Sequence, residues 1–282
     1  MRVLIIGSQN KSLDTMFQNI VDVLGHSSTV RCVRAYSAAL ESPLFPHPER
    51  VAPNPTTESE FVVNLFAAWK ACEDAYKEKR RGLPEHSVYA HVLKNLNSPN
   101  KRPLMGYYSG DISKRKPVDM HAELRTSLKR LADPKTSDTE DPKIWSPYQL
   151  RKLRECLHLC RSEVLREAQI VACTSVISGT TEMAEFASGD DDQIVLLVDQ
   201  ASTMPFPLSL IPFDTKWAHK IKGIYMFGDL EQGGVKVTAG SNKDNTLNEF
   251  LGAQKVSWFE SLLNNGFPSC SLGSEEINRS QY

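Results

Sequence analysis

Asp199 directly follows a short apolar run, Ile194–Val198, and a carboxylate in that position can hold a metal ion. If the run is a buried strand, its carboxyl end faces the crevice where open α/β sheets bind ligands. This is the Walker B arrangement, in which the carboxylate holds Mg²⁺, usually through water. An Asp at the end of a strand can equally cap the next helix. The motif alone therefore leaves both interpretations open.

The N-terminal sequence RVLIIGSQNKSLD, residues 2–14, has the order of a phosphate-binding loop: an apolar run, a glycine, then Lys11-Ser12. A P-loop requires G-x-x-x-x-G-K-[ST], because glycines let successive backbone N–H groups approach the phosphates closely. Here Asn10 precedes Lys11, and Ile5 occupies the position of the first glycine. The spacing therefore argues against a P-loop, and no other part of the chain supplies one.

Three further segments follow in a defined order. They are Val198-Asp-Gln-Ala-Ser202, Gly228-Asp-Leu-Glu-Gln232 and Ser257-Trp-Phe-Glu-Ser-Leu-Leu-Asn-Asn-Gly266. This order resembles the ATPase core of superfamily 1 helicases of the nonsense-mediated-decay, or NAM-seven-like, type. That family has D-E-A-S-Q, then G-D-x-x-Q-L-P-P, then S-x-F-E-R-L-x-x-x-G.

The N-terminal stretch fits the same resemblance. The family's motif Ia is a strand followed by A-P-S-N-x-A-V-D, which residues 7–14 match at Asn10 and Asp14. Residues 168–175 are similar to the family's strand that ends in a nucleic-acid-contacting threonine. The likeness covers residues 1–34 and 146–268. It implies a partial, discontinuous RecA-like helicase domain, residues 1–34 and 146–282, interrupted by an insertion at 35–145.

The resemblance also implies roles for individual residues. Asp199 would coordinate Mg²⁺, and Gln200 would stand in the position of the catalytic glutamate. ATP would be bound by the segment 228–232, through Gly228, Asp229 and Gln232. Gln232 would sense the γ-phosphate. The sugar-phosphate backbone of single-stranded RNA or DNA would be contacted by polar residues that follow two strands, namely Ser8, Asn10, Thr174 and Ser175. Such donors can position phosphates without reading sequence.

Several departures from the family pattern predict the loss of ATP hydrolysis. The chain begins at motif Ia, so the Walker A loop and its lysine, which hold the β- and γ-phosphates, are expected to be missing. Gln200 replaces the glutamate, and a carboxamide cannot accept a proton from water; losing a general base costs on the order of 10²–10⁴ in rate. Thr203 replaces the last glutamine of motif II, and Gly233-Gly234-Val235 replaces L-P-P. The second RecA-like domain, with its arginine finger, is also expected to be absent.

These observations favour a truncated or degenerate helicase-like protein that does not hydrolyse ATP as it stands. The alternative is a non-catalytic module that keeps the RecA-like fold and binds nucleic acid, or a protein partner through the insertion. A third possibility is a fragment of a longer, active helicase whose Walker A segment is encoded upstream.

The fold expected to position these motifs is α/β and RecA-like, of the P-loop NTPase type, with helices on both faces of a parallel sheet. Near-continuous apolar runs predict strands buried on both faces, at Val3–Ile6, Thr29–Val33, Gln169–Cys173, Ile194–Val198 and Ile221–Phe227. Apolar residues at helical spacing predict a helix from Leu13 to Leu24 that ends at Gly25, and a helix that begins at Ser146-Pro147. A last helix is predicted from about Asn245 to Leu263.

The stretch from about Tyr36 to Pro142 does not alternate between strands and helices, and it predicts a helical, loop-rich insertion. It begins with a proline-rich loop, residues 43–55, followed by a helix from about Glu58 to Arg81. Polar loops and a short amphipathic helix near Met120–Ala132 come next, then an exposed loop, Lys135 to Pro142. The basic runs Lys77–Arg81 and Lys114–Lys116 either bind RNA or a protein or, as the more frequent case, are solvated surface.

Net charge, hydropathy and cysteine spacing argue against several classes of protein. The 282 residues carry a formal net charge of −1, so overall charge provides no attraction for nucleic acid or acidic membranes. No apolar run approaches the roughly 20 residues that span a bilayer. Cys156 and Cys160 lie four residues apart, but no second Cys or His pair accompanies them, and the seven histidines show no ligand spacing. We expect an intracellular protein, cytoplasmic or nuclear, with reduced cysteines.

Overall fold

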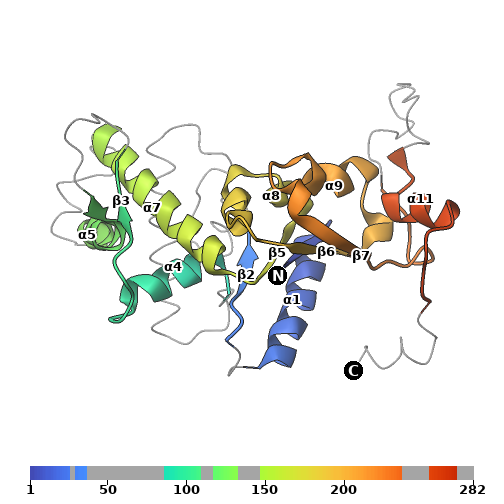
Figure 1. The fold of residues 1–282 in the computed structure, drawn as a ribbon, viewed down its shortest axis with the longest axis horizontal. Helices are drawn as coiled ribbons and strands as arrows, with labels where there is room; N and C mark the ends of the chain where they lie inside the picture. Colours follow the sequence, from blue (N-terminus) through green and yellow to red (C-terminus); the bar gives the residue numbers. More distant parts are fainter. Residues whose placement is uncertain (26–28, 37–85, 109–116, 133–146, 237–253, 272–282) are drawn as a thin grey trace.

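The centre of the computed structural model is a five-stranded parallel sheet with helices on both faces (Figure 1). The structure describes residues 1–25, 29–36, 86–108, 117–132, 147–236 and 254–271. The strand order is β2-β5-β1-β6-β7. The strands are β1 (Arg2–Gly7), β2 (Cys32–Ala35), β5 (Ile170–Thr174), β6 (Ile194–Asp199) and β7 (Ile221–Met226). The predicted α/β class and the presence of all five strands are confirmed, but burial on both faces is wrong for the edge strand β7, in which Ile224 is 41% and Tyr225 59% exposed.

Strand β2 begins three residues later than predicted, because its neighbour sets its register. β5 starts at Ile170, which pairs with Cys32, and the pairing continues to Cys173 beside Ala35. The residues before Cys32 precede the first ladder position of β5, so the β-branched residues at 29–30 lie outside the strand. The predicted range 29–33 is therefore wrong at its first three positions.

Helix α1 (Asn10–Leu24) covers one face of the sheet. Its buried residues Leu13 and Phe17 pack on Ile5 and Ala172 of the central strands. The helix ends at Gly25, which has a φ of 71° and donates its N–H to the Val21 carbonyl at 3.0 Å. Glycine adopts this left-handed conformation without steric cost, so the predicted end of the helix is confirmed.

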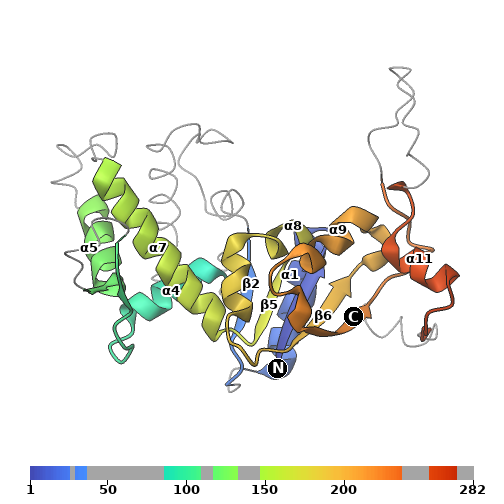
Figure 2. The ribbon, with the colours of Figure 1, turned by 45° about the horizontal axis from the view of Figure 1, so that its top comes forward.

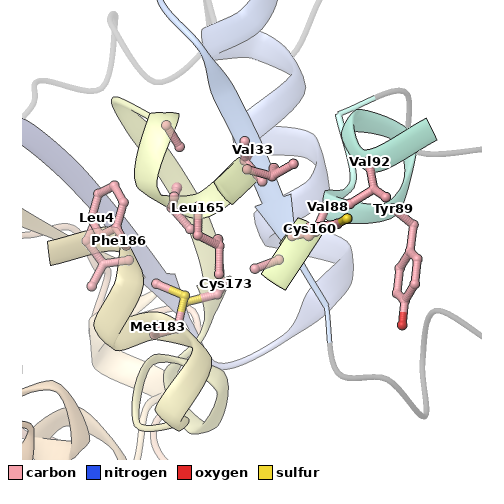
Figure 3. Close-up of a cluster of buried hydrophobic side chains, with 14 of the residues drawn as sticks. Leu4, Val33, Val88, Tyr89, Val92, Cys160, Leu165, Cys173, Met183 and Phe186 are labelled. Atoms are coloured by element: carbon pink, nitrogen blue, oxygen red, sulfur yellow. The ribbon is translucent and has the colours of Figure 1, made fainter. Parts of the chain in front are cut away.

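The opposite face carries the main hydrophobic core. Helix α7 (Pro147–Glu167) begins at Pro147, as predicted, and contacts the 3₁₀ helix η3 (Thr181–Ala187). Figure 3 shows part of this core, in which Leu4 of β1 and Val33 of β2 lie in one cluster with Leu165 and Phe186. The predicted N-cap, Ser146, lies outside the described residues.

Two helices of the expected insertion share this core with the sheet. Helix α5 (Met120–Ala132) has the predicted bounds, and α4 (Val88–Asn97) packs with it against α7. Sequence interpretation missed α4, having assigned its residues to polar loops. Its apolar positions nevertheless repeat at helical spacing, and the hydroxyl of Ser87 caps it by accepting the N–H of Ala90 at 3.1 Å.

A short antiparallel pair, β3 (Met105–Gly106) and β4 (Val118–Asp119), precedes α5. In both ribbon views α4, α5 and α7 lie to one side of the sheet and α11 (Trp258–Asn264) to the other (Figure 2). The predicted proline-rich loop 43–55, the helix 58–81, the loop 135–142 and both basic runs, 77–81 and 114–116, lie outside the described residues.

The last predicted helix is wrong as one continuous element. Residues 255–257 are not helical, because Ser257 pairs its backbone with Pro205 and then caps a new helix, α11, by accepting the N–H of Glu260 at 3.0 Å. The predicted end is confirmed: α11 stops at Asn264, and Gly266 follows with a φ of 76°. Within the described parts of the chain, no helix is both long and apolar enough to cross a membrane.

Candidate functional site

The site lies where the connections from two neighbouring strands diverge. β1 and β6 are adjacent, and their last residues, Gly7 and Asp199, are paired in register. After β1 the chain enters α1 on one face of the sheet. After β6 it enters the 3₁₀ helix η4 (Ala201–Thr203), which packs in the core of the other face. Ligands of open α/β sheets bind at such a switch point, outside the carboxyl ends of the strands.

A hollow of about 660 Å³ opens at this point. It is lined by residues from the ends of three strands, including Ser8, Asp199, Gln200, Asp229, Gln232 and Lys236. An apolar groove of about 770 Å³ runs on from it beside α1 and shares Gln9, Asp199 and Gln200 with the hollow. Residues from three of the segments that resemble the helicase core, 7–14, 198–202 and 228–232, therefore line one hollow.

Hydrogen bonds tie the three loops together. Ser8 Oγ lies 3.3 Å from Thr203 Oγ1, which joins the loop after β1 to the loop after β6. The backbone N–H of Asp229 donates to Ser202 Oγ at 3.2 Å, which joins the loop after β7 to the same turn. Gly228 must be glycine for this approach, because a Cβ there would lie 2.8 Å from the backbone nitrogen of Ser202.

The turn after β6 has an unusual backbone. Gln200 has φ 51° and ψ 42° and is the sole non-glycine residue with positive φ in the described chain. Such a conformation costs a residue with a Cβ about 1–2 kcal/mol. The backbone N–H of Ala201 donates to the carbonyl of Phe227 at 2.7 Å, and this bond to the next loop helps hold the turn.

The carboxylate of Asp199 is half-buried at the junction of hollow and groove. Burial raises its pKa above the ordinary value, although hydrogen bonds from the backbone of Gln200 and the hydroxyl of Ser12 partly oppose the rise. The Asp199 carboxylate is therefore partly desolvated, and it lines the groove together with residues of the first turn of α1.

The donor set does not fit Mg²⁺ with a nucleoside triphosphate. Two carboxylates, Asp199 and Asp229, line the hollow beside a single lysine, Lys236, so the lining does not offset the concentrated charge of a triphosphate. Gly7 provides no phosphate cradle, because a Cβ at Gly7 would meet Leu13 Cγ at 2.7 Å. Its missing side chain makes room for α1. Among the residues that the structure describes, no three His, Cys, Asp or Glu side chains gather to hold a metal ion.

Three residues implied to contact nucleic acid do not line the hollow. The side-chain oxygen of Asn10 accepts from Arg34 Nη2 at 2.8 Å, on the side of α1 away from the hollow's lining. Ser175 is buried, and its hydroxyl donates to the carbonyl of Leu208, so it is closed to a ligand. Thr174 is half-buried at the end of β5. Ser8 alone of the four reaches the hollow.

Sequence interpretation missed three residues that shape the site. Ser12 lies in the first turn of α1 and lines the groove with Asp199, and Lys236 supplies the hollow's positive charge. Arg34 lies in β2 and is only 1% exposed, although its side chain is charged. A charged residue next to the apolar pair Cys32-Val33 was the available signal, since buried arginines need several partners.

Comparison with known proteins adds no family: no family model matches the chain, and no curated protein matches it significantly.

Proposed function

We propose that this chain is a helicase-like protein of RecA type that binds single-stranded nucleic acid at the hollow and does not hydrolyse ATP. The observation that carries the proposal is the convergence of three distant segments, residues 7–14, 198–202 and 228–232, around one hollow at the switch point of the sheet. They are three of the five segments on which the resemblance to superfamily 1 helicases rests; residues 168–175 and 257–266 do not line the hollow. Chain order alone does not require them to meet.

The neutral hydrogen-bonding groups of the lining suit a sugar-phosphate backbone, whose negative charges are spread along the strand rather than concentrated as in a triphosphate. Ser8 and Thr203 present hydroxyls, Gln200 and Gln232 present amides, and Lys236 presents one positive charge. A hydroxyl exchanges an internal hydrogen bond for a phosphate oxygen by rotating its proton, so neither hydroxyl oxygen must move. Contacts of this kind position a strand without reading its sequence. The volume lies within the range of small-ligand sites and accommodates a nucleotide unit of a strand.

ATP and Mg²⁺, the cofactors implied by the resemblance, are not expected to support turnover. If they bind, Asp199 is the residue that would hold the metal and Gln232 the one that would face the γ-phosphate. Gln200 can orient a water molecule but cannot accept its proton, so the general base of the family is lost. The two carboxylates that line the hollow further disfavour a triphosphate.

Two matched threonine variants test this proposal. Thr203 and Thr180 are both half-buried and both donate to the carbonyl three residues earlier, at 3.0 and 2.8 Å, but Thr203 lines the hollow and Thr180 does not. Fluorescence anisotropy with a labelled oligouridine of roughly 12 nucleotides measures Kd. We expect Thr203→Val to weaken binding about tenfold and Thr180→Val to leave it unchanged. Equal effects of the two variants, or no binding by the wild type, would contradict the proposal.

A further inference from the structure

We infer that Arg34 is a positioning residue for the hollow, and that Asn10 and Asp14 are its anchors rather than contacts for a ligand. This inference rests on the proposed function and assigns roles that differ from those the helicase resemblance implies. It follows from two observations. Arg34 forms hydrogen bonds with residues on one side of the first turns of α1, and residues on the opposite side line the hollow or its groove.

The guanidinium of Arg34 joins two strands to one helix. Its Nε donates to Asp14 Oδ1 and its Nη2 to Asn10 Oδ1, both at 2.8 Å. Its Nη1 donates to the carbonyls of Ala35 in β2 and Ala172 in β5, at 3.0 and 3.2 Å. Four of the five N–H donors are thus engaged. The start of α1 is fixed to the sheet through one side chain.

Tyr36 contacts both Arg34 and Asp14. The guanidinium carbon lies 4.2 Å from the centroid of the Tyr36 ring, and the Tyr36 hydroxyl donates to Asp14 Oδ1 at 2.8 Å. The same carboxylate oxygen therefore accepts from both Arg34 and Tyr36. A planar cation that stacks on a ring and forks between two acceptors must be arginine, because an ammonium group offers neither the plane nor the fork.

The other side of the same helical turns faces the hollow. Gln9 and Ser12 line the groove that continues from the hollow, as does Asp199. Gln9 is the N-cap residue of α1 and makes no side-chain capping bond, so this end of the helix is held locally by the Ser12 hydroxyl, which donates to the Gln9 carbonyl at 3.2 Å. Arg34 adds the constraint that fixes this end to the sheet. It acts through Asn10 and Asp14 on Ser8, Gln9 and Ser12, which contact the hollow or its groove.

Two arginine-to-lysine variants test this positioning role. Arg161 is a matched control because it is also buried, at 8% exposure, pairs with Glu182 at 2.7 Å and lies 5.0 Å from the ring centroid of Tyr89. It belongs to α7 and does not line the hollow. Three quantities are measured for each variant: Tm, Kd for the labelled oligouridine, and hydrogen exchange at the backbone amides of residues 8–14.

We expect Arg34→Lys and Arg161→Lys to lower Tm, whereas only Arg34→Lys weakens oligouridine binding, by about tenfold. We also expect only Arg34→Lys to speed exchange at residues 8–14 under conditions where the rest of the sheet stays protected. A Kd that rises no more in Arg34→Lys than in Arg161→Lys would overturn the inference, as would unchanged exchange at 8–14. The exchange measurement needs no ligand. It therefore tests the positioning role even if the wild type fails to bind oligouridine, which would count against the proposed function.

Discussion

Ser8 Oγ and Thr203 Oγ1 lie 3.3 Å apart, although 195 positions separate them in the sequence. Because the Thr203 hydroxyl donates its proton to the carbonyl of Gln200, Ser8 is the donor in the bond between them. The pair thus joins the loop after β1 to the strained turn after β6. It marks the point where the segments that resemble helicase motifs Ia and II meet.

A double-mutant cycle on this pair should show coupling. We expect Ser8→Ala and Thr203→Val each to lower the free energy of unfolding by about 1 kcal/mol, and the double variant to lose less than the sum. Urea unfolding of the four proteins measures the coupling energy. Strict additivity would show that the two hydroxyls do not interact in solution.

The backbone of Gln200 gives a second expectation. Since the φ of Gln200 is 51°, Gln200→Gly removes the strain of a Cβ in this conformation. Glycine also raises the conformational entropy of the unfolded chain, which costs less free energy than the strain. We therefore expect the variant to be more stable by up to about 1 kcal/mol. Gln200→Val should destabilise it, because a β-branched residue tolerates this conformation least. Denaturant midpoints of the two variants compare them directly. Destabilisation by glycine would contradict the left-handed turn.

Variants of Gly7 and Leu13 test whether Gly7 is needed for the close packing of β1 against α1. A Cβ at Gly7 would meet Leu13 Cγ at 2.7 Å, and Leu13 is fully buried. We expect Gly7→Ala to cost about 1–3 kcal/mol, and to cost clearly less when Leu13→Ala has already removed the clash. Thermal unfolding of the two single variants and of the double variant separates the cost of the clash from the cost of losing the leucine side chain. An equal cost of Gly7→Ala in both backgrounds would show that the clash is not the cause.

His91 makes stability depend on pH. Burial, aided by the positive charge of Arg31, lowers the pKa of His91 to about 4, and its Nδ1 has no hydrogen-bond partner while Nε2 lies 3.1 Å from the carbonyl of Cys32. The folded protein therefore binds the His91 proton less readily than the unfolded chain does. This contribution to stability is fully present above the ordinary pKa of 6.5 and is lost as pH falls towards 4, by up to about 3 kcal/mol.

The pH window separates the titration of His91 from that of the carboxylate Glu163. Burial alone would raise the pKa of Glu163, but the hydrogen bond with His121 and the charge of Lys101 outweigh it and lower the pKa below 4.5. Its contribution is thus complete above pH 4.5. Urea unfolding between pH 7.5 and about 5 covers the range above the titration of Glu163, and His91→Leu should flatten the curve there. A slope as steep in His91→Leu as in the wild type would assign the pH dependence to other groups.

The sequence was most informative where the apolar pattern is continuous. The strands and α1 could be predicted because each combines an uninterrupted apolar run or stripe with a clear end, such as Gly25 or Asp199. Helix α4 was missed because prolines and polar residues on both sides of Val88–Asn97 obscure a short apolar stripe. The break before α11 could not be predicted, since it depends on the tertiary pairing of Ser257 with Pro205.

The candidate site was predictable only in part. Asp199, Gly228 and Asp229 follow apolar runs, so their place at the carboxyl edge of the sheet could be inferred. The exclusion of Ser175 depends on a contact with Leu208, and the side of α1 on which Asn10 lies is set by its bond to Arg34. Both depend on contacts between distant segments, which spacing along the chain does not reveal.

The central claim is that the hollow binds single-stranded nucleic acid without the use of ATP. Its most direct test is the equilibrium binding of labelled oligouridine with and without Mg²⁺–ATP, with phosphate release followed in the same samples. We expect saturable binding with the same Kd in both conditions and no phosphate release above background. Absence of binding would contradict the claim, as would hydrolysis on the order of 1 s⁻¹ that Asp199→Asn abolishes.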